Sequence, residues 1–208
     1  MTKNCYTREQ IETTVKEKGY KWFEDNNDKG YDVNIVGVRN SKTKGRGTNA
    51  FDDCLTISYK IDGEWQFHCF QCTTDPGTAY MDNPILENTG CAILKPGQYR
   101  GSHKLRLHQG KYLALGQKKP MKIYRDANLD GKYDLIEESV REELIGINIH
   151  RATSRSGGKS TRVDKWSAGC QVIADNDDWH EFLDICQAAR EIHGNSFSYT
   201  LIESKDIE

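Results

Sequence analysis

The sequence lacks a strong excess of charge of either sign. Its 208 residues include 29 Lys and Arg against 31 Asp and Glu, which gives a formal net charge of -2. Domains that bind nucleic acid usually carry a clear excess of positive charge. The charge balance therefore argues against a nucleic-acid partner, and it suits a soluble globular protein with a polar surface.

Long hydrophobic runs are also missing. No stretch approaches the roughly 20 apolar residues of a membrane-spanning helix, so we expect no membrane insertion. The N-terminal residues M-T-K-N-C-Y-T-R-E-Q contain no apolar core of a secretory signal. We therefore expect synthesis in the cytoplasm, and a protein that works elsewhere needs another delivery system.

The cysteines lack the even count and regular spacing of a disulfide framework. There are seven, and most are expected to be small buried apolar residues. Cys69 and Cys72 form a C-x-x-C motif, but no second paired motif accompanies it and the run alternates like a strand. We predict that the two cysteines pack on opposite faces of a strand, in preference to a zinc site or a redox pair.

Helices are expected near the two ends of the chain. Thr7-Arg8-Glu9-Gln10 has the form of a capping box and begins an expected helix over 8–18. A second helix is expected after Asp175 or Asp177, because apolar residues then recur at helical spacing until Gly194.

Short strands and frequent turns fill the middle of the chain. An alternating run on each side of Asp62-Gly63 predicts a hairpin, and further strands are expected at 112–115, 121–124 and 197–202. We predict a mainly β fold, a β-sandwich or barrel, with flanking N- and C-terminal helices. Residues 1–30 are expected to be a helical extension of a domain over 31–208.

A cysteine and a histidine occupy positions that suit nucleophilic catalysis. In G-I-N-I-H-R-A (146–152), His150 ends an alternating run, and in W-S-A-G-C-Q-V (166–172), small residues precede Cys170. An imidazole can take the proton of a thiol, since the thiolate is the reactive form. Backbone N–H groups of Gly169 and Cys170 are candidate oxyanion donors, and a backbone carbonyl is expected to orient the ring of His150. The residues alone also fit a structural explanation, a buried thiol and a loop histidine.

These segments resemble the active-site motif of the L,D-transpeptidase catalytic domain (YkuD-like) family. In that family a histidine is followed by a loop and then by S-x-G-C, and here the spacing from His150 to Cys170 is 20 residues. The turns T-D-P-G (74–77) and I-L-K-P-G-Q-Y (93–99) also look like that family, and the resemblance covers 32–173. It is closest to the compact versions found in tailed phages and prophages.

The resemblance implies a catalytic β-domain that acts on peptidoglycan stem peptides. Cys170 would be the nucleophile and His150 the general base, with Ser167 and Gly169 shaping the site. The thiolate would attack the carbonyl of an L-residue that precedes a D-residue and give an acyl-enzyme, and no organic cofactor is implied. Delivery to the cell wall by a phage-type release system is then expected.

The sequence departs from the family motif at two positions. The usual arginine soon after the cysteine is absent, since Gln171-Val172-Ile173 stands there, and Arg151 replaces the glycine after the histidine. Five nearby residues are candidates for binding the substrate, and the arginines among them suit a carboxylate because their guanidinium group is planar. The five are His108, Arg151, Arg155, Arg162 and Trp166.

Residues 126–137, D-A-N-L-D-G-K-Y-D-L-I-E, match the twelve-residue loop of an EF-hand. The expected oxygen ligands are Asp126, Asn128, Asp130, the carbonyl of Lys132, Asp134 and Glu137. A strand, not a helix, is expected before this loop. We predict a structural calcium site inserted in a β-domain; the alternative is a metal-free Asx-rich turn.

Four functions stay open from the sequence. The favoured one is a cysteine-dependent L,D-peptidase or carboxypeptidase, possibly lytic in a phage, with hydrolysis of the acyl-enzyme; the alternative in the same class is a true L,D-transpeptidase. A calcium-stabilised binding or virion structural module without turnover is an alternative of another class. A cysteine protease of unrelated fold needs the same Cys-His pair. The oligomeric state is left open.

Overall fold

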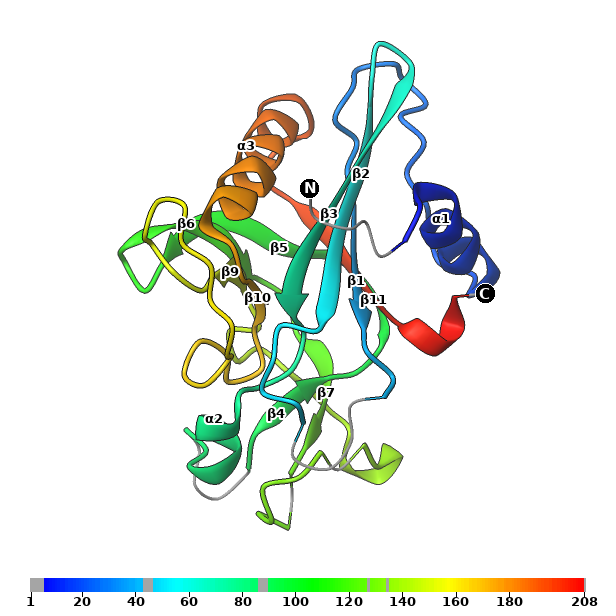
Figure 1. Ribbon diagram of the computed structural model, residues 1–208. Helices are drawn as coiled ribbons and strands as arrows, with labels where there is room; N and C mark the ends of the chain where they lie inside the picture. Colours follow the sequence, from blue (N-terminus) through cyan, green and yellow to red (C-terminus); the bar gives the residue numbers. More distant parts are fainter. Residues whose placement is uncertain (1–5, 43–46, 86–89, 127, 134, 208) are drawn as a thin grey trace.

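The computed structural model describes residues 6–42, 47–85, 90–126, 128–133 and 135–207. Most of its regular structure is β, as the sequence predicted, and eight strands close a barrel (Figure 1). They are β1 (Asn34–Arg39), β2 (Asp53–Ile61), β3 (Glu64–Thr73), β5 (Gly97–His108), β6 (Tyr112–Gln117), β9 (Ile149–Arg151), β10 (Gln171–Ile173) and β11 (Phe197–Glu203). Their order around the barrel is β1-β11-β5-β6-β9-β10-β3-β2.

A second, three-stranded sheet lies below the barrel in Figure 1. It consists of β4 (Ala92–Leu94), β7 (Met121–Arg125) and β8 (Arg141–Glu143), in the order β4-β7-β8. The strand predicted at 121–124 is thus confirmed, and it leads into the loop with calcium-binding spacing. The short helices η1 (Glu137–Ser139) and η2 (Ser204–Asp206) follow that loop and β11.

Alternation along the strands separates the barrel interior from its outer face. In β2, Leu55 and Ile57 are fully buried in the main core, whereas Cys54 belongs to a second apolar cluster. In β3, Cys72 lies in the main core and Cys69 packs against the second cluster. The C-x-x-C cysteines therefore do pack on opposite faces, as predicted, because side chains three residues apart on a strand point in opposite directions.

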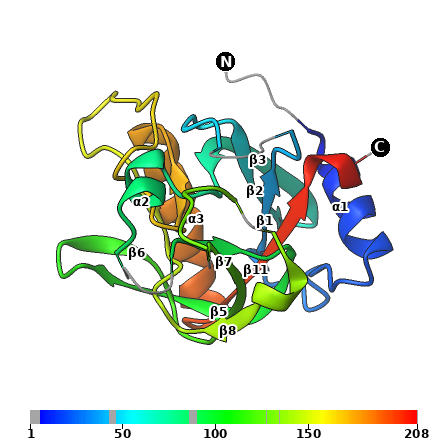
Figure 2. The ribbon, with the colours of Figure 1, turned by 90° about the horizontal axis from the view of Figure 1, so that it is seen from below.

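The helices cover different sides of the barrel (Figures 1 and 2). Helix α1 (Arg8–Glu17) begins with the predicted capping box of Thr7 and Gln10, and its residues Ile11 and Val15 pack in the second cluster. Helix α3 (Asn176–His193) is capped by Asp175 and places Trp179 and Phe182 in the main core. Both predicted helices are confirmed. The short helix α2 (Thr78–Asp82) follows β3.

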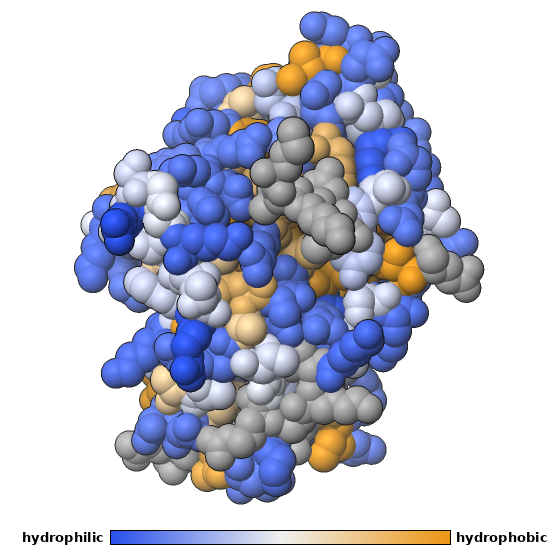
Figure 3. Space-filling model, in the orientation of Figure 1, coloured by the Kyte–Doolittle hydropathy of each residue, from blue (hydrophilic) through white to orange (hydrophobic). Residues whose placement is uncertain are grey.

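The surface is largely polar on the face drawn in Figure 3. Large apolar side chains are exposed at a few places, which include Ile85 beside α2, Leu144 and Ile145 after β8, and Trp166 before β10. Among the described residues, no helix has both the length and the apolar character needed to cross a bilayer.

A buried ionic group lies where β1 and β3 end and β2 begins. The guanidinium of Arg39 pairs with Asp75 at 2.9 Å and donates to the carbonyl oxygens of Thr74 and Leu94. Asp53 accepts the N–H and the hydroxyl of Thr74 at 2.6 and 2.8 Å. Burial raises the pKa of Asp53 and that of Asp75, and Arg39 opposes the rise through its positive charge.

This ionic group supports the loop that leads to Cys170. It fixes the turn over 74–77, and the N–H of Gly77 then donates to the carbonyl oxygen of Ser167 at 2.9 Å. A Cβ atom on Gly77 would lie 2.0 Å from the carbonyl oxygen of Asp164, so the two segments approach more closely than any other residue permits. The T-D-P-G turn therefore holds the 164–167 segment in place.

We expect Arg39→Met to destabilise the fold by roughly 3–5 kcal/mol, because it leaves two buried carboxyl groups without their cation. The loss should be larger at pH 8 than at pH 5, since carboxyl groups with raised pKa values favour the folded state only while protonated. Urea unfolding at both pH values measures it, with the exposed Lys29→Met as control. A loss below about 1 kcal/mol that does not change with pH would contradict the stabilising role.

Candidate active site

Parallel pairing of β9 and β10 brings the two predicted catalytic residues onto one face. Val172 pairs with His150 and Gln171 with Ile149. Cys170 precedes Val172 by two residues, so its side chain lies on the same side of the sheet as His150. Ile149 and Ile173 point the other way, into the main core. Cys170 and His150 therefore share the outer face of the barrel wall.

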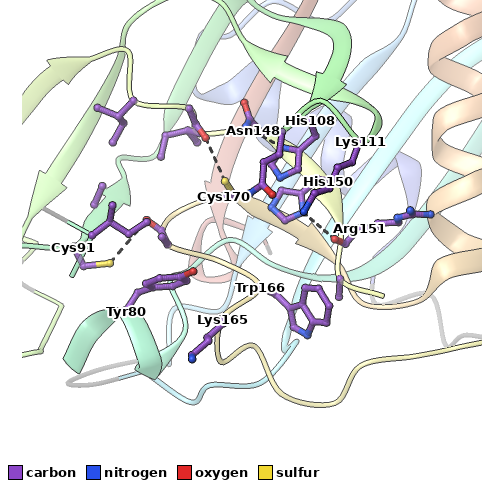
Figure 4. Close-up of a pocket in the computed structure, with 18 of the residues that line it drawn as sticks. Tyr80, Cys91, His108, Lys111, Asn148, His150, Arg151, Lys165, Trp166 and Cys170 are labelled. Carbon is purple, nitrogen blue, oxygen red and sulfur yellow. Dashed lines mark hydrogen bonds between the residues drawn. The ribbon is translucent and has the colours of Figure 1, made fainter. Parts of the chain in front are cut away.

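A cavity of about 700 Å³ opens on this face (Figure 4). Both Cys170 and His150 line it. Its other walls come from α2, the start of β4, the tip of the β5–β6 hairpin, and the segments 145–148 and 165–168. Concave sites of this size commonly hold small molecules or short peptide segments.

The ring of His150 is held in the tautomer that a general base requires. Its Nδ1 lies 2.8 Å from the carbonyl oxygen of Arg151, which only accepts hydrogen bonds, so Nδ1 carries the proton. The hydroxyl of Tyr112 lies further away, at 3.4 Å. Nε2 then carries the lone pair that can take a proton. The orienting carbonyl expected from the sequence is therefore that of Arg151.

His108 lies directly against His150. The two rings stack with centroids 4.4 Å apart and planes inclined by 23°. Asn148 accepts the N–H of Gln117 with Oδ1, which leaves its Nδ2 to donate to Nδ1 of His108 at 3.2 Å. The structure thus brings His108 to the site, where it is a neutral ring packed on the base.

The thiol of Cys170 rests on a backbone carbonyl. Its Sγ atom donates to the carbonyl oxygen of Gly146 at 3.3 Å (Figure 4). The buried amide of Gln117 fixes that segment, because its Oε1 accepts the N–H groups of Ile145, Gly146 and Ile147 at 3.2, 2.8 and 2.8 Å. Figure 4 shows the side chains of Cys170 and His150 facing the same cavity.

Side-chain hydrogen bonds define the loop before Cys170. Ser167 donates its hydroxyl to the carbonyl oxygen of Cys170 at 2.8 Å and accepts the N–H of Gly169 at 3.1 Å. Buried Gln171 donates to the carbonyl oxygen of Gly169 and accepts the hydroxyl of Tyr199. The N–H of Gly169 is therefore occupied, which corrects its expected role as an oxyanion donor. The N–H of Cys170 remains as the donor of that pair.

Gly169 is required by its backbone conformation. Its φ is +121°, and a Cβ atom there would lie 2.6 Å from the carbonyl oxygen of Ala92. Only glycine avoids both the strain and the clash. Ser167 and Gly169, which the sequence predicted to shape the site, form the turn that precedes Cys170.

Both partners of the pair are neutral in the resting site. Burial raises the pKa of the Cys170 thiol to about 11, against a smaller lowering by the hydrogen bond with Asn148. Burial lowers the pKa of His150 to about 4, although the hydrogen bond with Arg151 acts in the opposite direction. The arrangement favours a thiol that is deprotonated during attack over a preformed thiolate–imidazolium pair.

The predicted substrate-binding residues do not all reach the cavity. His108, Arg151 and Trp166 line it. The guanidinium of Arg151 lies 4.3 Å from the ring centroid of Tyr112, and the indole of Trp166 is 44% exposed at the cavity margin. Arg155 and Arg162 are exposed on the loop after β9 and do not line the cavity.

Several residues of the site were not singled out from the sequence. They are Tyr80, Cys91, Lys111, Tyr112, Gln117, Asn148 and Lys165. Alternation over 146–152 was a usable signal for Asn148, because it puts that residue on the face of His150. The others come from distant segments, so no local pattern indicates them.

The first half of the predicted calcium loop forms Asx turns. Asp126 accepts the N–H groups of Asp130 and Gly131 at 3.2 and 3.0 Å, and Asn128 also accepts that of Asp130 at 3.0 Å. Lys132 directs its ammonium to Asp130 at 2.6 Å. Asp134 lies outside the described residues.

The last expected ligand points to other partners. Glu137 accepts the hydroxyl of Tyr124 at 3.1 Å and pairs with Lys95. No group of three or more His, Cys, Asp or Glu in the described ranges is arranged to hold a metal ion. Glu137 would have to leave Lys95 to bind the ion, and Asp130 would have to leave Lys132. The calcium site stays a prediction.

Comparisons of the chain with protein-family models, curated proteins and solved structures found no match.

The pH dependence of turnover should follow the neutral pair. Because burial lowers the pKa of His150 to about 4 and raises that of Cys170 to about 11, kcat/KM should stay nearly constant from pH 5.5 to 9. The acid limb appears only as His150 gains its proton, near pH 4. A half-maximal rate near pH 6.5, the value of an ordinary imidazole, would contradict this state.

Calcium should raise the melting temperature of metal-stripped protein if the 126–137 loop binds it, since a ligand of the folded state alone stabilises that state. Differential scanning calorimetry with calcium and with magnesium measures the shift. Asp126→Asn should abolish it, whereas Asp62→Asn in the β2–β3 turn serves as control. An unchanged melting temperature across millimolar calcium would remove the metal prediction.

Proposed function

We propose that the chain is a cysteine-dependent enzyme that acts on peptidoglycan stem peptides by forming an acyl-enzyme at an L,D bond and hydrolysing it. The observation that carries the proposal is the placement of Cys170 and His150 on one face of adjacent parallel strands, in a shared cavity. The motif resemblance supplies the substrate class. The barrel would then be a version of the L,D-transpeptidase catalytic fold, which acts in the cell wall after phage-type release.

Acylation needs one proton carrier and one nucleophile. The thiol proton of Cys170 passes to Nε2 of His150 as sulfur bonds to the substrate carbonyl carbon. The negative oxygen of the tetrahedral intermediate accepts the N–H of Cys170. His150 then gives the proton to the leaving nitrogen, the C–N bond breaks, and a thioester remains on Cys170.

Deacylation reverses the roles with a new nucleophile. His150 takes a proton from water as the water oxygen bonds to the thioester carbon, and the C–S bond breaks when the intermediate collapses. The sulfur recovers its proton from His150. An amine in place of water gives transpeptidation by the same steps, so the acceptor alone separates the two activities. The absence of an arginine after Cys170 supports hydrolysis as the favoured version.

One observation favours a second candidate, a binding module without turnover. The raised pKa of Cys170 and its hydrogen bond to Gly146 describe a thiol at rest. A fold that had lost its activity would keep such a thiol as a packing residue. The ordered tautomer of His150 weighs against this candidate, because packing alone does not require it.

Digestion of purified muropeptides, followed by mass spectrometry, tests the proposal. The wild-type protein should release a D-residue from the stem peptide, and Cys170→Ala should lower the rate at least about 10³-fold. His150→Ala should behave similarly, whereas Cys69→Ala, which packs against the second cluster and does not line the cavity, should retain activity. Folding of each variant is checked by circular dichroism.

Three results separate the candidates. Exchange of the D-residue for an added D-amino acid indicates a transpeptidase. An unchanged muropeptide with folded wild-type protein favours the binding module. Equal rates for Cys170→Ala and wild type would refute the nucleophile assignment.

A further inference from the structure

The cavity around Cys170 carries charge of one sign. Four cationic side chains line it: Lys111, Arg125, Arg151 and Lys165. No Asp or Glu occurs among its described lining residues. A concave site lined by one sign of charge raises the local concentration of oppositely charged ligands. The cavity is therefore built for an anion.

Two of the four cations are already engaged. Arg125 pairs with Glu143 at 2.6 Å and donates to the carbonyl oxygen of Gly90. Arg151 lies over the ring of Tyr112 and approaches the side-chain oxygen of Asn176 at 3.5 Å. These side chains are held by the protein, so neither is the first choice for a ligand.

Lys111 and Lys165 are different, since both are exposed and neither forms an ion pair within the described ranges of the chain. A lysine ammonium in a cavity without a carboxylate partner can bind an anion without first breaking a contact. Their charges are thus available to a substrate.

The two lysines lie on different sides of the thiol. Lys111, at the tip of the β5–β6 hairpin, lies beside the histidine rings, and Figure 4 shows Lys165 on the side of Tyr80 and Trp166. Burial lowers the pKa of His108, and the charges of Arg106 and Lys111 act in the same direction. The thiol of Cys170 lines the same cavity as both cations.

The position of the general base determines which part of the substrate lies near each lysine. His150 must deliver its proton to the leaving nitrogen, so the leaving group occupies the histidine side of the cavity. A terminal amino acid that leaves carries its α-carboxylate two bonds from that nitrogen. The carboxylate then lies on the side of Lys111, and the acyl part of the substrate extends toward Lys165.

We propose that the cavity selects acyl donors with a carboxylate on each side of the attacked carbonyl, the leaving-group carboxylate bound by Lys111 and that of the acyl part by Lys165. This inference rests on the proposed acyl transfer at Cys170. It makes the enzyme an exopeptidase that removes one terminal residue, and it places carboxylate recognition on lysines instead of the residue after the cysteine. Gln171, the first residue after Cys170, is buried and accepts the hydroxyl of Tyr199.

Alkylation of Cys170 tests the anion site without any peptidoglycan activity. Iodoacetate and iodoacetamide both form an S–C bond with loss of iodide, but only iodoacetate is an anion. Rates at Cys170 are followed on its tryptic peptide by mass spectrometry, and each is divided by the rate with N-acetylcysteine amide. At low ionic strength, the ratio of the normalised iodoacetate rate to the normalised iodoacetamide rate should be about five. This ratio should fall in 0.5 M salt.

Matched lysine variants locate the effect. Lys111→Met and Lys165→Met should each lower the ratio about two-fold or more, whereas the remote Lys29→Met should leave it unchanged. A wild-type ratio at or below one overturns the proposal. A ratio that responds to only one of the two lysines overturns its two-carboxylate form.

Paired peptides then assign the leaving-group side. Each pair has the same L,D bond at its end, with a free C-terminal carboxylate in one peptide and an amide in the other. We expect kcat/KM to favour the free acid by about ten-fold in the wild type and in Lys165→Met, and this preference to vanish in Lys111→Met. Equal cleavage of acid and amide by the wild type overturns the assignment of Lys111.

The peptidase proposal and the anion-site proposal can be refuted independently. If neither peptide is cleaved but the alkylation ratio depends on both lysines, the peptidase proposal fails and the anion site stands. If the peptides are cleaved by a thiol-dependent reaction without preference for a carboxylate, the peptidase stands and the anion site fails.

Discussion

The candidate site depends on one pairing, that of β9 with β10. These strands are short, and their parallel register sets Cys170, Asn148 and His150 on the same outer face of the barrel. A shift by one residue would turn the sulfur into the core and leave the imidazole outside. The polar contacts of Ser167, Gly169 and Gln171 secure the loop that delivers the cysteine to this register.

Burial then controls the chemistry. A thiol with a raised pKa and an imidazole with a lowered one remain uncharged together, so the site carries no ion pair that a substrate must displace. The positive charge of the cavity comes from lysine and arginine side chains around the pair. The thiol itself donates to the carbonyl oxygen of Gly146.

The sequence predicted what depends on local patterns. The capping box of Thr7, the apolar stripe of α3 and the hairpin at Asp62-Gly63 all give short-range signals, and the structure confirms them. Cys170 and His150 could be proposed as a pair from the sequence because both belong to one sequence motif. Closure of the barrel, the carbonyl of Gly146 and the cations at 111 and 165 depend on segments far apart in the sequence, and no periodicity reports such contacts. The occupied N–H of Gly169 depends on a side chain two residues away, which the motif did not reveal.

The central claim is that Cys170 attacks the substrate with His150 as its base. Intact-protein mass spectrometry after rapid mixing with a purified stem tetrapeptide and an acid quench tests it most directly. The account predicts a transient mass increase equal to the acyl fragment, located on the peptide that contains Cys170, and far slower to form in His150→Ala. Release of the terminal residue with no adduct on Cys170, or with an adduct on another side chain, would contradict it.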